Sequence, residues 1–251
     1  MKLYCAFLHG RKGFVIVMER LSLSLLKFSA WLLPKVEEVA DDATRNVHFI
    51  LFLSIFIDVT EALVYLHGRG IRHCDINPAN ILLGFYDVES SIRIVAKVGD
   101  FGVSRKHPPA MIKEERGSPA YMAPELISDD GMMTPGDCQC DVYSFGLTMI
   151  ETLTGKRPGA LTKTERHTQW RDLSLKLSCQ NCRDSEPCNG CFRLIADNCM
   201  NFVPSNRPTA GQLLTQLKSL TRFFQPDELN RLDIDRSDLR AQVFRRTVTR
   251  D

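Results

Sequence analysis

The stretch "IRHCDINPANILL" (residues 71–83) decides how this sequence is interpreted. Two polar residues, Asp75 and Asn80, stand five positions apart within it. The residues around them are apolar: Ile71, Ile76, Ile81, Leu82 and Leu83. An apolar frame of this kind predicts that a buried scaffold holds two polar groups in place, where they can bind a metal ion or move a proton.

The composition predicts one large globular domain or two small ones, because 44% of the 251 residues are hydrophobic and 25% are charged. The formal net charge is only +2, with acids and bases interspersed, so we expect no nucleic-acid partner. The chain starts without a clear signal peptide, and its most apolar run, 49–57, is nine residues long, too short to span a bilayer. We therefore expect a cytoplasmic protein without a membrane partner, whose nine cysteines are reduced or bind metal.

Hydrophobic periodicity predicts the main elements. Two strands, "MKLYCAF" and "GFVIVMER", are joined by the turn-rich "LHGRKG" near the start. Apolar stripes of helical period predict three helices, over 47–67, over 141–154 and from about Thr209. Short strands are predicted within 80–84 and 92–102, around a loop-rich site.

Two further motifs follow the first. "GDFG" at 99–102 contains Asp100, and "GSPAYMAPE" occupies 117–125. In this order the motifs resemble the protein kinase family, and the last one resembles its serine/threonine pattern. The resemblance covers residues 1–221 and leaves 222–251 as a charged C-terminal extension. It implies an α+β, protein-kinase-like fold, with a mostly helical C-terminal lobe and a two-stranded remnant of the N-terminal lobe.

The resemblance implies a role for each polar residue of these motifs. Asp75 is expected to accept the proton of a serine or threonine hydroxyl on a protein substrate, with ATP as the phosphoryl donor. Asn80 and Asp100 are expected to bind magnesium, a hard cation that prefers oxygen ligands. An Asp near a Gly is commonly a turn former, but turn formation alone does not fix all three separations.

The nucleotide side of the site is expected near the start of the chain. "VMERL" (17–21) resembles the end of the family's fifth strand and the hinge that follows it. The resemblance makes Met18 the gatekeeper and turns the backbone of Glu19 and Leu21 toward adenine. It adds Leu82 to the nucleotide-binding residues.

Other matching residues are expected to be structural. Glu125 would pair with Arg207 of "SNRPT", and Asp141 of "DVYSFG" would brace the catalytic loop from a central helix. His73 would stack on Phe101 as a packed core residue.

Two positions in the catalytic loop depart from the family pattern. Cys74 replaces the Arg before the catalytic Asp, and Asn77 replaces the Lys two residues after it. Asn77 is still counted among the catalytic residues, because an amide can hydrogen-bond a phosphate, but it cannot neutralise the charge, so transfer is expected to be slower.

The sequence also opens at what resembles the fourth strand of the family, without a Gly-rich loop or the lysine and glutamate that position the phosphates. Two interpretations follow: a fragment of a working kinase, or an inactive kinase-like lobe that acts as a protein-interaction scaffold. The first is favoured, since a scaffold has no chemical use for Asp75, Asn80 and Asp100 together.

A second signal is "CQNCRDSEPCNGC", which contains Cys179, Cys182, Cys188 and Cys191. Two CxxC pairs supply four thiolates, the ligand set of a structural zinc site. The alternatives are four reduced thiols in a loop, or disulfides formed under oxidative stress. Cys199 is expected in the core, and the sequence suggests no function for Cys138 or Cys140.

Overall fold

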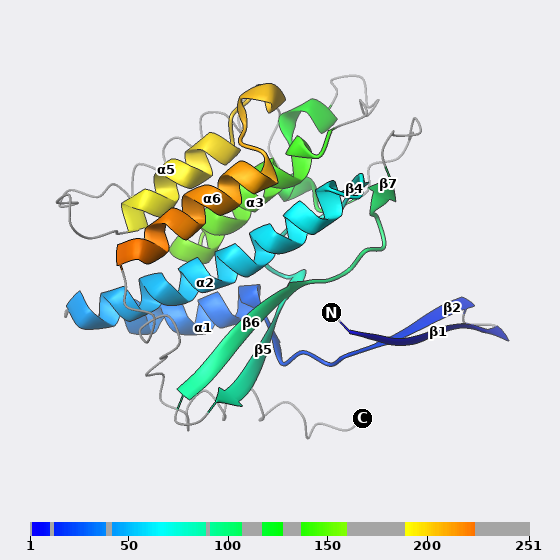
Figure 1. Cartoon of the computed structure of the whole chain (residues 1–251), viewed down its shortest axis with the longest axis horizontal. Helices are drawn as coiled ribbons and strands as arrows, with labels where there is room; N and C mark the ends of the chain where they lie inside the picture. Colours follow the sequence, from blue (N-terminus) through cyan, green and yellow to red (C-terminus); the bar gives the residue numbers. More distant parts are fainter. Residues whose placement is uncertain are drawn as a thin grey trace.

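A long apolar helix, α2 (Asp42–His67), runs through the helical body of the computed structural model (Figure 1). The structure describes residues 2–10, 13–38, 42–88, 91–106, 117–127, 137–159 and 189–223. Apolar side chains occur on most faces of α2, the pattern of a largely buried helix, although Glu61 and Tyr65 are exposed. It contacts both helix α6 (Ala210–Leu220) and strand β6 (Ser91–Val98), so helices and strands share one core.

The apolar part of α2 is longer than the nine-residue run in the sequence suggested. His48–His67 spans 20 residues with a mean hydropathy of 2.1, which by length and composition alone is enough to cross a membrane. The nine-residue limit was wrong because Asp58 was taken as the end of the run. Asp58 lies inside the helix, where its carboxylate accepts the Ala96 N–H at 2.8 Å. Most of this span is buried in the protein.

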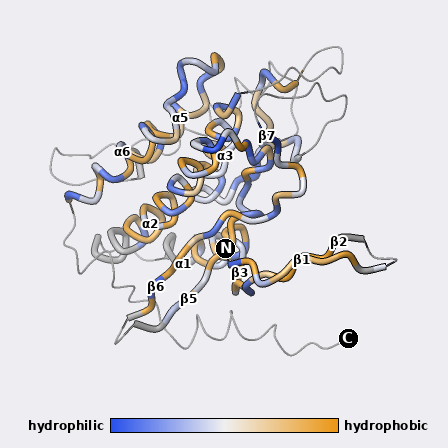
Figure 2. The backbone as a smooth tube through the Cα atoms, turned by 45° about the vertical axis from the view of Figure 1, so that its right-hand side comes forward, coloured by the Kyte–Doolittle hydropathy of each residue, from blue (hydrophilic) through white to orange (hydrophobic). Residues whose placement is uncertain are grey.

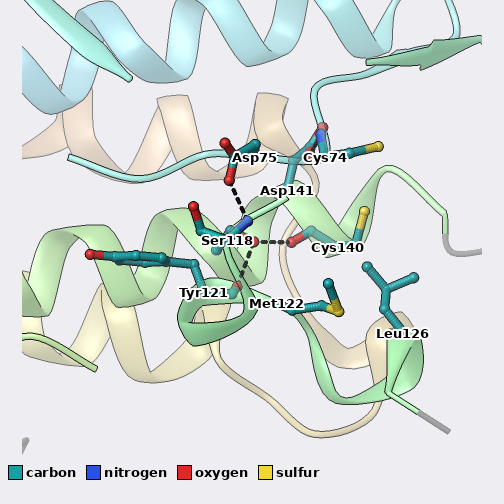
Figure 3. Close-up of a pocket in the computed structure, with 9 residues that line it drawn as sticks. Cys74, Asp75, Ser118, Tyr121, Met122, Leu126, Cys140 and Asp141 are labelled. Atoms are coloured by element: carbon teal, nitrogen blue, oxygen red, sulfur yellow. Dashed lines mark hydrogen bonds between the residues drawn. The ribbon is translucent and has the colours of Figure 1, made fainter. Parts of the chain in front are cut away.

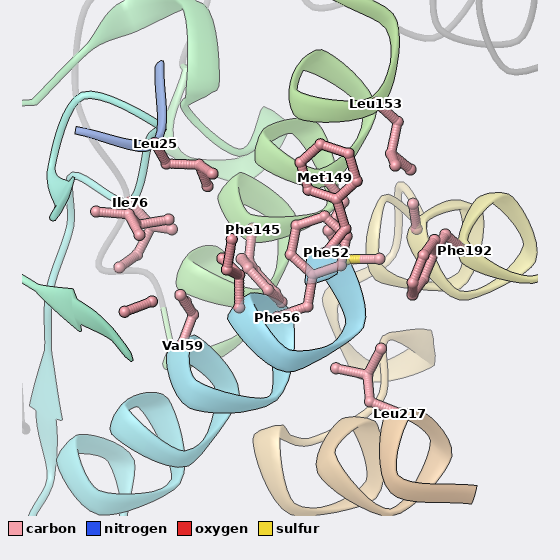
Figure 4. Close-up of a cluster of buried hydrophobic side chains, with 14 of the residues drawn as sticks. Leu25, Phe52, Phe56, Val59, Ile76, Phe145, Met149, Leu153, Phe192 and Leu217 are labelled. Carbon is pink, nitrogen blue, oxygen red and sulfur yellow. The ribbon is translucent and has the colours of Figure 1, made fainter. Parts of the chain in front are cut away.

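Aromatic rings join α2 to two other helices (Figure 4). Phe56 of α2 meets Phe145 of α3 (Gln139–Thr154) edge to face, with ring centroids 5.9 Å apart. It meets Phe192 of α5 (Asn189–Cys199) in the same way at 5.2 Å. Edge-to-face contacts of this kind stabilise a core beyond the area they bury. The three rings fix the helices around one centre.

The ends of α3 and α6 follow the sequence signals. Gly155 ends α3 with a left-handed φ of 67°, and Thr209 caps α6 in a reciprocal capping box with Gln212. Gly146 allows α3 and α5 to approach each other, because a Cβ there would lie 2.9 Å from the Cβ of Cys199. Cys199 is fully buried, as the sequence predicted.

Seven strands form three small sheets in the described residues. Strands β1 (Leu3–His9) and β2 (Gly13–Met18) make the antiparallel hairpin that the sequence predicted. The second sheet has the order β3-β5-β6, with β3 at Leu23–Ser24 and β5 at Ile81–Val88. The third pairs β4 (Ile71–Arg72) with β7 (Arg105–Lys106) on the two sides of the catalytic loop region.

The β1-β2 hairpin extends away from the helices, and its apolar residues are visible along both strands (Figures 1 and 2). Leu3, Leu8 and Ile16 are 60%, 80% and 51% exposed. The predicted α+β, kinase-like fold is thus a helical body with a small strand region beside it.

Helix α1 (Leu25–Glu38) has no counterpart among the predicted helices, and it contains Pro34. Its buried face is Leu25, Phe28 and Leu32, at helical spacing. The N–H of Leu26 donates to the carbonyl of Pro78 at 2.9 Å, which ties the start of α1 to the catalytic loop.

Candidate active site

One carboxylate on α3 holds the start of the catalytic loop. Asp141, 1% exposed, accepts the N–H of His73 at 2.8 Å and the N–H of Cys74 at 2.8 Å. It also lies 3.0 Å from Nε2 of His67, at the end of α2. The predicted brace between the central helix and the loop is therefore confirmed.

His73 connects the loop to the "GDFG" segment. Its ring is fully buried, and Nε2 lies 2.9 Å from the carbonyl oxygen of Gly99. Nδ1 accepts the N–H of Asp75 at 3.3 Å, so Nε2 carries the ring proton and donates to Gly99. The ring also meets Phe101 edge to face at 4.9 Å, which confirms the predicted contact. His73 is a packed core residue.

Hydrogen bonds from three residues, Ser118, Asn77 and Asn80, hold the carboxylate of Asp75 and its carbonyl group. Oδ1 accepts the N–H of Ser118 at 2.7 Å (Figure 3), and Oδ2 accepts Nδ2 of Asn80 at 2.7 Å. Nδ2 of Asn77 donates to Oδ1 at 3.1 Å, and Nδ2 of Asn80 also donates to the Asp75 carbonyl at 2.9 Å. Every one of these donors is an uncharged N–H, and within the described residues the carboxylate forms no ion pair with a cation.

Asn80 and Asp100 are brought together through the backbone, since the Gly99 N–H donates to the Asn80 carbonyl at 2.9 Å. The Asn80 amide turns its NH₂ toward Asp75, which leaves its Oδ1 for a ligand. Asp100 is exposed and has a left-handed φ of 57°. Among the described residues its carboxylate accepts one hydrogen bond, from the Gly102 N–H to Oδ1 at 3.2 Å. One amide oxygen and one carboxylate fit the oxygen ligands that magnesium prefers.

The segment 117–127 is fixed to the helical body by a buried ion pair. Arg207 donates from Nη1 and Nη2 to the two carboxylate oxygens of Glu125, at 2.6 and 2.7 Å. Its side chain is 0% exposed, and it also donates to the carbonyls of Asn201 and Gln139. The predicted pair is confirmed, with the bidentate geometry that strengthens a charge-assisted hydrogen bond.

Gly117 allows this segment to reach the catalytic loop. Its φ is 109°, and a Cβ at this position would lie 2.5 Å from the carbonyl oxygen of Cys74. Only glycine fits both conditions. The next residue, Ser118, can then donate its N–H to Asp75.

Comparisons with known proteins agree with this geometry. The family model "Protein kinase domain" matches residues 12–217 of the chain. The chain belongs to the protein kinase family. Its relatives include the probable serine/threonine-protein kinase gdt2 of Dictyostelium discoideum, 32% identical over 71% of this chain and 10% of that protein. A putative receptor-like protein kinase of Arabidopsis thaliana is 38% identical over 79% of this chain and 21% of its own length.

A third relative, serine/threonine-protein kinase 33 of Bos taurus, is 30% identical over 64% of this chain and 33% of its own length. The chain therefore spans from about a tenth to a third of the length of these three relatives.

In this kinase chain, the side-chain amide of Asn77 makes hydrogen bonds within the protein. The residue is 4% exposed, and its Nδ2 lies within 3.3 Å of acceptors on Asp75 and Ser118. Its Oδ1 accepts the N–H groups of Ala79 and Asn80 at 2.9 and 3.2 Å. Asn77 therefore acts through Asp75 as a positioning residue, and its expected contact with a phosphate stays a prediction.

The residues predicted on the nucleotide side are spread over the hairpin, the segment that follows it and the β3-β5-β6 sheet. Met18 ends β2 and is 42% exposed. Leu21 reaches the sheet beside Gly84, and Leu82 is paired with Ser24 across β3 and β5. Their roles in nucleotide binding stay predictions.

Glu19 anchors this region to β6. Its carboxylate pairs with Nζ of Lys97 at 2.7 Å, and its N–H donates to the Lys2 carbonyl at 2.8 Å. The hydrogen bond from Lys97, with one from the Lys2 backbone, lowers the pKa of Glu19. Sequence reasoning missed Lys97, because nothing in the local pattern links two residues so far apart in the chain.

Of the proposed zinc ligands, Cys179, Cys182 and Cys188 lie outside the described residues. Cys191 is partly exposed in the first turn of α5. Within the described ranges, no cluster of three or more His, Cys, Asp or Glu side chains is arranged to hold a metal ion. The zinc site therefore stays a prediction.

Proposed function

We propose that this kinase chain transfers the γ-phosphoryl group of ATP to serine or threonine hydroxyls of protein substrates, with Asp75 as the base. The observation that carries the proposal is the bonding of Asp75. Its carboxylate is held from both sides by the Ser118 N–H and the Asn80 amide, each at 2.7 Å. Such a carboxylate is presented in one orientation, which is what proton transfer from a hydroxyl requires.

Asp75 would accept a hydrogen bond from the substrate hydroxyl and take its proton as the oxygen attacks phosphorus. Because its present partners are neutral donors, the carboxylate keeps its negative charge available for this step. The Ser118 N–H links the base to the segment 117–127. We infer that this segment also helps to place the substrate.

Asn80 and Asp100 would hold magnesium through the amide Oδ1 and the Asp100 carboxylate. When bound, the ion neutralises phosphate charge and orients the phosphates for transfer. Asn80 has two roles in this scheme, because its NH₂ orients Asp75 while its oxygen faces the ion. This shared amide would fix the base relative to the phosphates.

The assignment to serine and threonine is supported by the motif at 117–125 and by relatives named as serine/threonine kinases. Asn77 carries no positive charge near the transferring phosphoryl group. We therefore expect slower transfer than a lysine at this position would give.

The test compares Asp75→Asn with the native protein in transfer of labelled phosphate from ATP to a library of serine and threonine peptides. We expect a loss of about 10²- to 10⁴-fold, the usual contribution of a positioned base. Glu61→Gln is the matched control, since it removes a carboxylate that is half exposed on α2. Native folded protein that transfers no phosphate, or equal rates for both variants, would contradict the proposal and favour the scaffold interpretation.

A further inference from the structure

Cys74 occupies a strained and partly exposed position beside the base. Its φ is 66°, a left-handed value that non-glycine residues rarely adopt, and its N–H donates to Asp141. The next residue is Asp75. Strained backbone positions concentrate at functional sites, because the surrounding contacts must hold them.

Cys140 lines the same pocket as Cys74, from the first turn of α3. The pocket is small, with a cavity volume of about 10 Å³, and it is lined by Cys74, Asp75, Ser118 and Cys140 among others. Figure 3 shows both sulfur atoms on the same side of it. Both residues are free thiols, and Cys140 is 2% exposed whereas Cys74 is partly exposed.

The two thiols differ in acidity. A hydrogen bond from Cys140 lowers the pKa of Cys74, against the opposing effects of burial and of Asp141. Arg72 and Arg105 also favour the Cys74 thiolate. The same hydrogen bond, together with complete burial, raises the pKa of Cys140. Cys74 is therefore the nucleophile of the pair, and the Cys140 thiol stays protonated and donates to it.

We propose that Cys74 and Cys140 form a peroxide-sensitive dithiol site that becomes a disulfide and lowers the activity of the kinase. Cys74 is the partly exposed thiol that an oxidant meets, and the buried Cys140 is the resolving thiol. The effect on activity rests on the proposed function, whereas the chemistry of the site does not. Two-electron oxidants of the hydroperoxide class are the reactants.

The chemistry takes two steps. The Cys74 thiolate attacks one oxygen of hydrogen peroxide, the O–O bond breaks, and hydroxide leaves, which gives a sulfenic acid at Cys74. The Cys140 sulfur then attacks the Cys74 sulfur, an S–S bond forms, and the sulfenic oxygen leaves as water with the Cys140 proton. Two thiols and one peroxide become one disulfide and two waters. A thiol reductant reverses the change by disulfide exchange.

The disulfide would act on the base through the adjoining peptide. Cys74 would be joined covalently to α3, while its N–H still bonds to Asp141 on the same helix. Asp75 follows directly, and its two 2.7 Å contacts depend on the present course of this loop. A change at Cys74 would therefore disturb the orientation of Asp75.

Cys138 provides an internal comparison only two residues from Cys140. It is partly exposed and does not line the pocket, and burial raises its pKa to about 11. A pKa two units above the ordinary value of 9.0 lowers the thiolate fraction about 100-fold, and higher nucleophilicity recovers about tenfold of this. We expect iodoacetamide at neutral pH to alkylate Cys74 at least about tenfold faster than Cys138.

The decisive experiment treats the full chain with hydrogen peroxide, blocks remaining thiols by alkylation, and maps non-reduced peptides by mass spectrometry. We expect the Cys74 and Cys140 peptides to be joined, with the loss of two hydrogens, and to separate after reduction. Cys138→Ser should leave the link unchanged. Cys140→Ser should abolish it and leave a sulfenic acid at Cys74 that dimedone traps, with Cys140→Ala as a second variant if the first does not fold.

Cys74 that stays unlinked in the native protein, or a link from Cys74 to Cys138, would overturn the proposal. Phosphate transfer is measured on the same samples, before oxidation and after reduction. A link that forms without any change in measurable transfer would overturn the regulatory part. A link in a protein that transfers no phosphate even when reduced supports the dithiol site and contradicts the proposed function instead.

Discussion

Two ion pairs of nearly equal length occupy different surroundings in this molecule. Arg207 and Glu125 lie 2.6 Å apart behind the segment 117–127, with side chains 0% and 19% exposed. Lys218 and Glu61 lie 2.7 Å apart between α6 and α2, with side chains 52% and 51% exposed. The two distances are alike, so the difference in burial decides how much each ion pair contributes to the stability of the fold. Water screens the second pair but hardly reaches the first.

The contacts that hold the site in place are also made by buried polar groups. Asp141 is 1% exposed, and it receives two loop N–H groups and His67. The comparison therefore indicates that the same buried polar groups stabilise both the site and the core. Changes to those groups should alter folding and transfer together, while changes to exposed charges away from the site, such as Lys218 and Glu61, should have little effect on either.

The largest effect is expected from Arg207→Ala, because it removes both charge-assisted hydrogen bonds to the partly buried carboxylate of Glu125. We expect a loss of about 3–5 kcal/mol in the free energy of unfolding, measured by urea titration. The matched change Lys218→Ala should cost less than about 1 kcal/mol. Equal losses of unfolding free energy in the two variants would show that burial does not distinguish the two ion pairs.

A smaller loss is expected from Asp141→Asn. One loop N–H would keep an oxygen acceptor, but the other would face an NH₂ group that also donates. We expect about 2–3 kcal/mol less stability, since hydrogen bonds to charged groups contribute this much. Transfer should fall as well, because the loop would lose the contact beside Asp75. Asp137→Asn, an exposed change near the same helix end, is the control, and a similar effect there would refute the role of Asp141.

The smallest of the three stability effects is expected at Asp58, a partly buried carboxyl group on α2. Burial raises the pKa of Asp58 to about 6, despite the hydrogen bond from the Ala96 N–H that opposes this. The folded state thus holds the proton more tightly than the unfolded state, whose pKa is near 3.8. The stability from Asp58 is present below pH 3.8 and is lost as the pH rises to about 6.

Asp58→Asn keeps an acceptor for Ala96 and cannot ionise. Relative to the native protein, we expect it to gain about 1–2 kcal/mol between pH 4 and pH 7, after allowing for partial exposure of the carboxyl group. Glu61→Gln, on the exposed side of the same helix, should show no such trend. Urea titrations at several pH values measure both, and parallel curves for native protein and Asp58→Asn would show that this carboxyl group is not buried in solution.

Sequence patterns predicted the parts of the fold with strong local signals. Gly155 and Thr209 mark the ends of α3 and α6 because capping depends on neighbours in the sequence. Helix α1 was missed, since Pro34 interrupts the usual helical pattern and the missing N–H is tolerated on an exposed turn. The helix over 47–67 was predicted, but its apolar span was taken to end at Asp58, because the hydrogen-bond partner of Asp58 lies on β6, outside the local pattern.

The candidate site was predicted in its main residues, because Asp75, Asn80 and Asp100 lie in motifs with fixed spacing. The residues that contact the site region from other parts of the chain were not predicted. Cys140 meets Cys74, and Lys97 meets Glu19, only after helices and strands have packed. Gly117 was available as a signal, but its necessity depends on the carbonyl of Cys74, which lies next to it only in the folded chain.

Calorimetric titration of ATP, with and without magnesium, tests the central claim most directly in the variants Asp100→Asn and Asp75→Asn. Asp100 is assigned to the metal and Asp75 to the acceptor hydroxyl. We predict that Asp100→Asn weakens magnesium-dependent ATP binding by about tenfold or more, whereas Asp75→Asn changes it by less than about twofold while abolishing transfer. Equal losses of magnesium-dependent affinity in the two variants, or none in Asp100→Asn, would contradict the account.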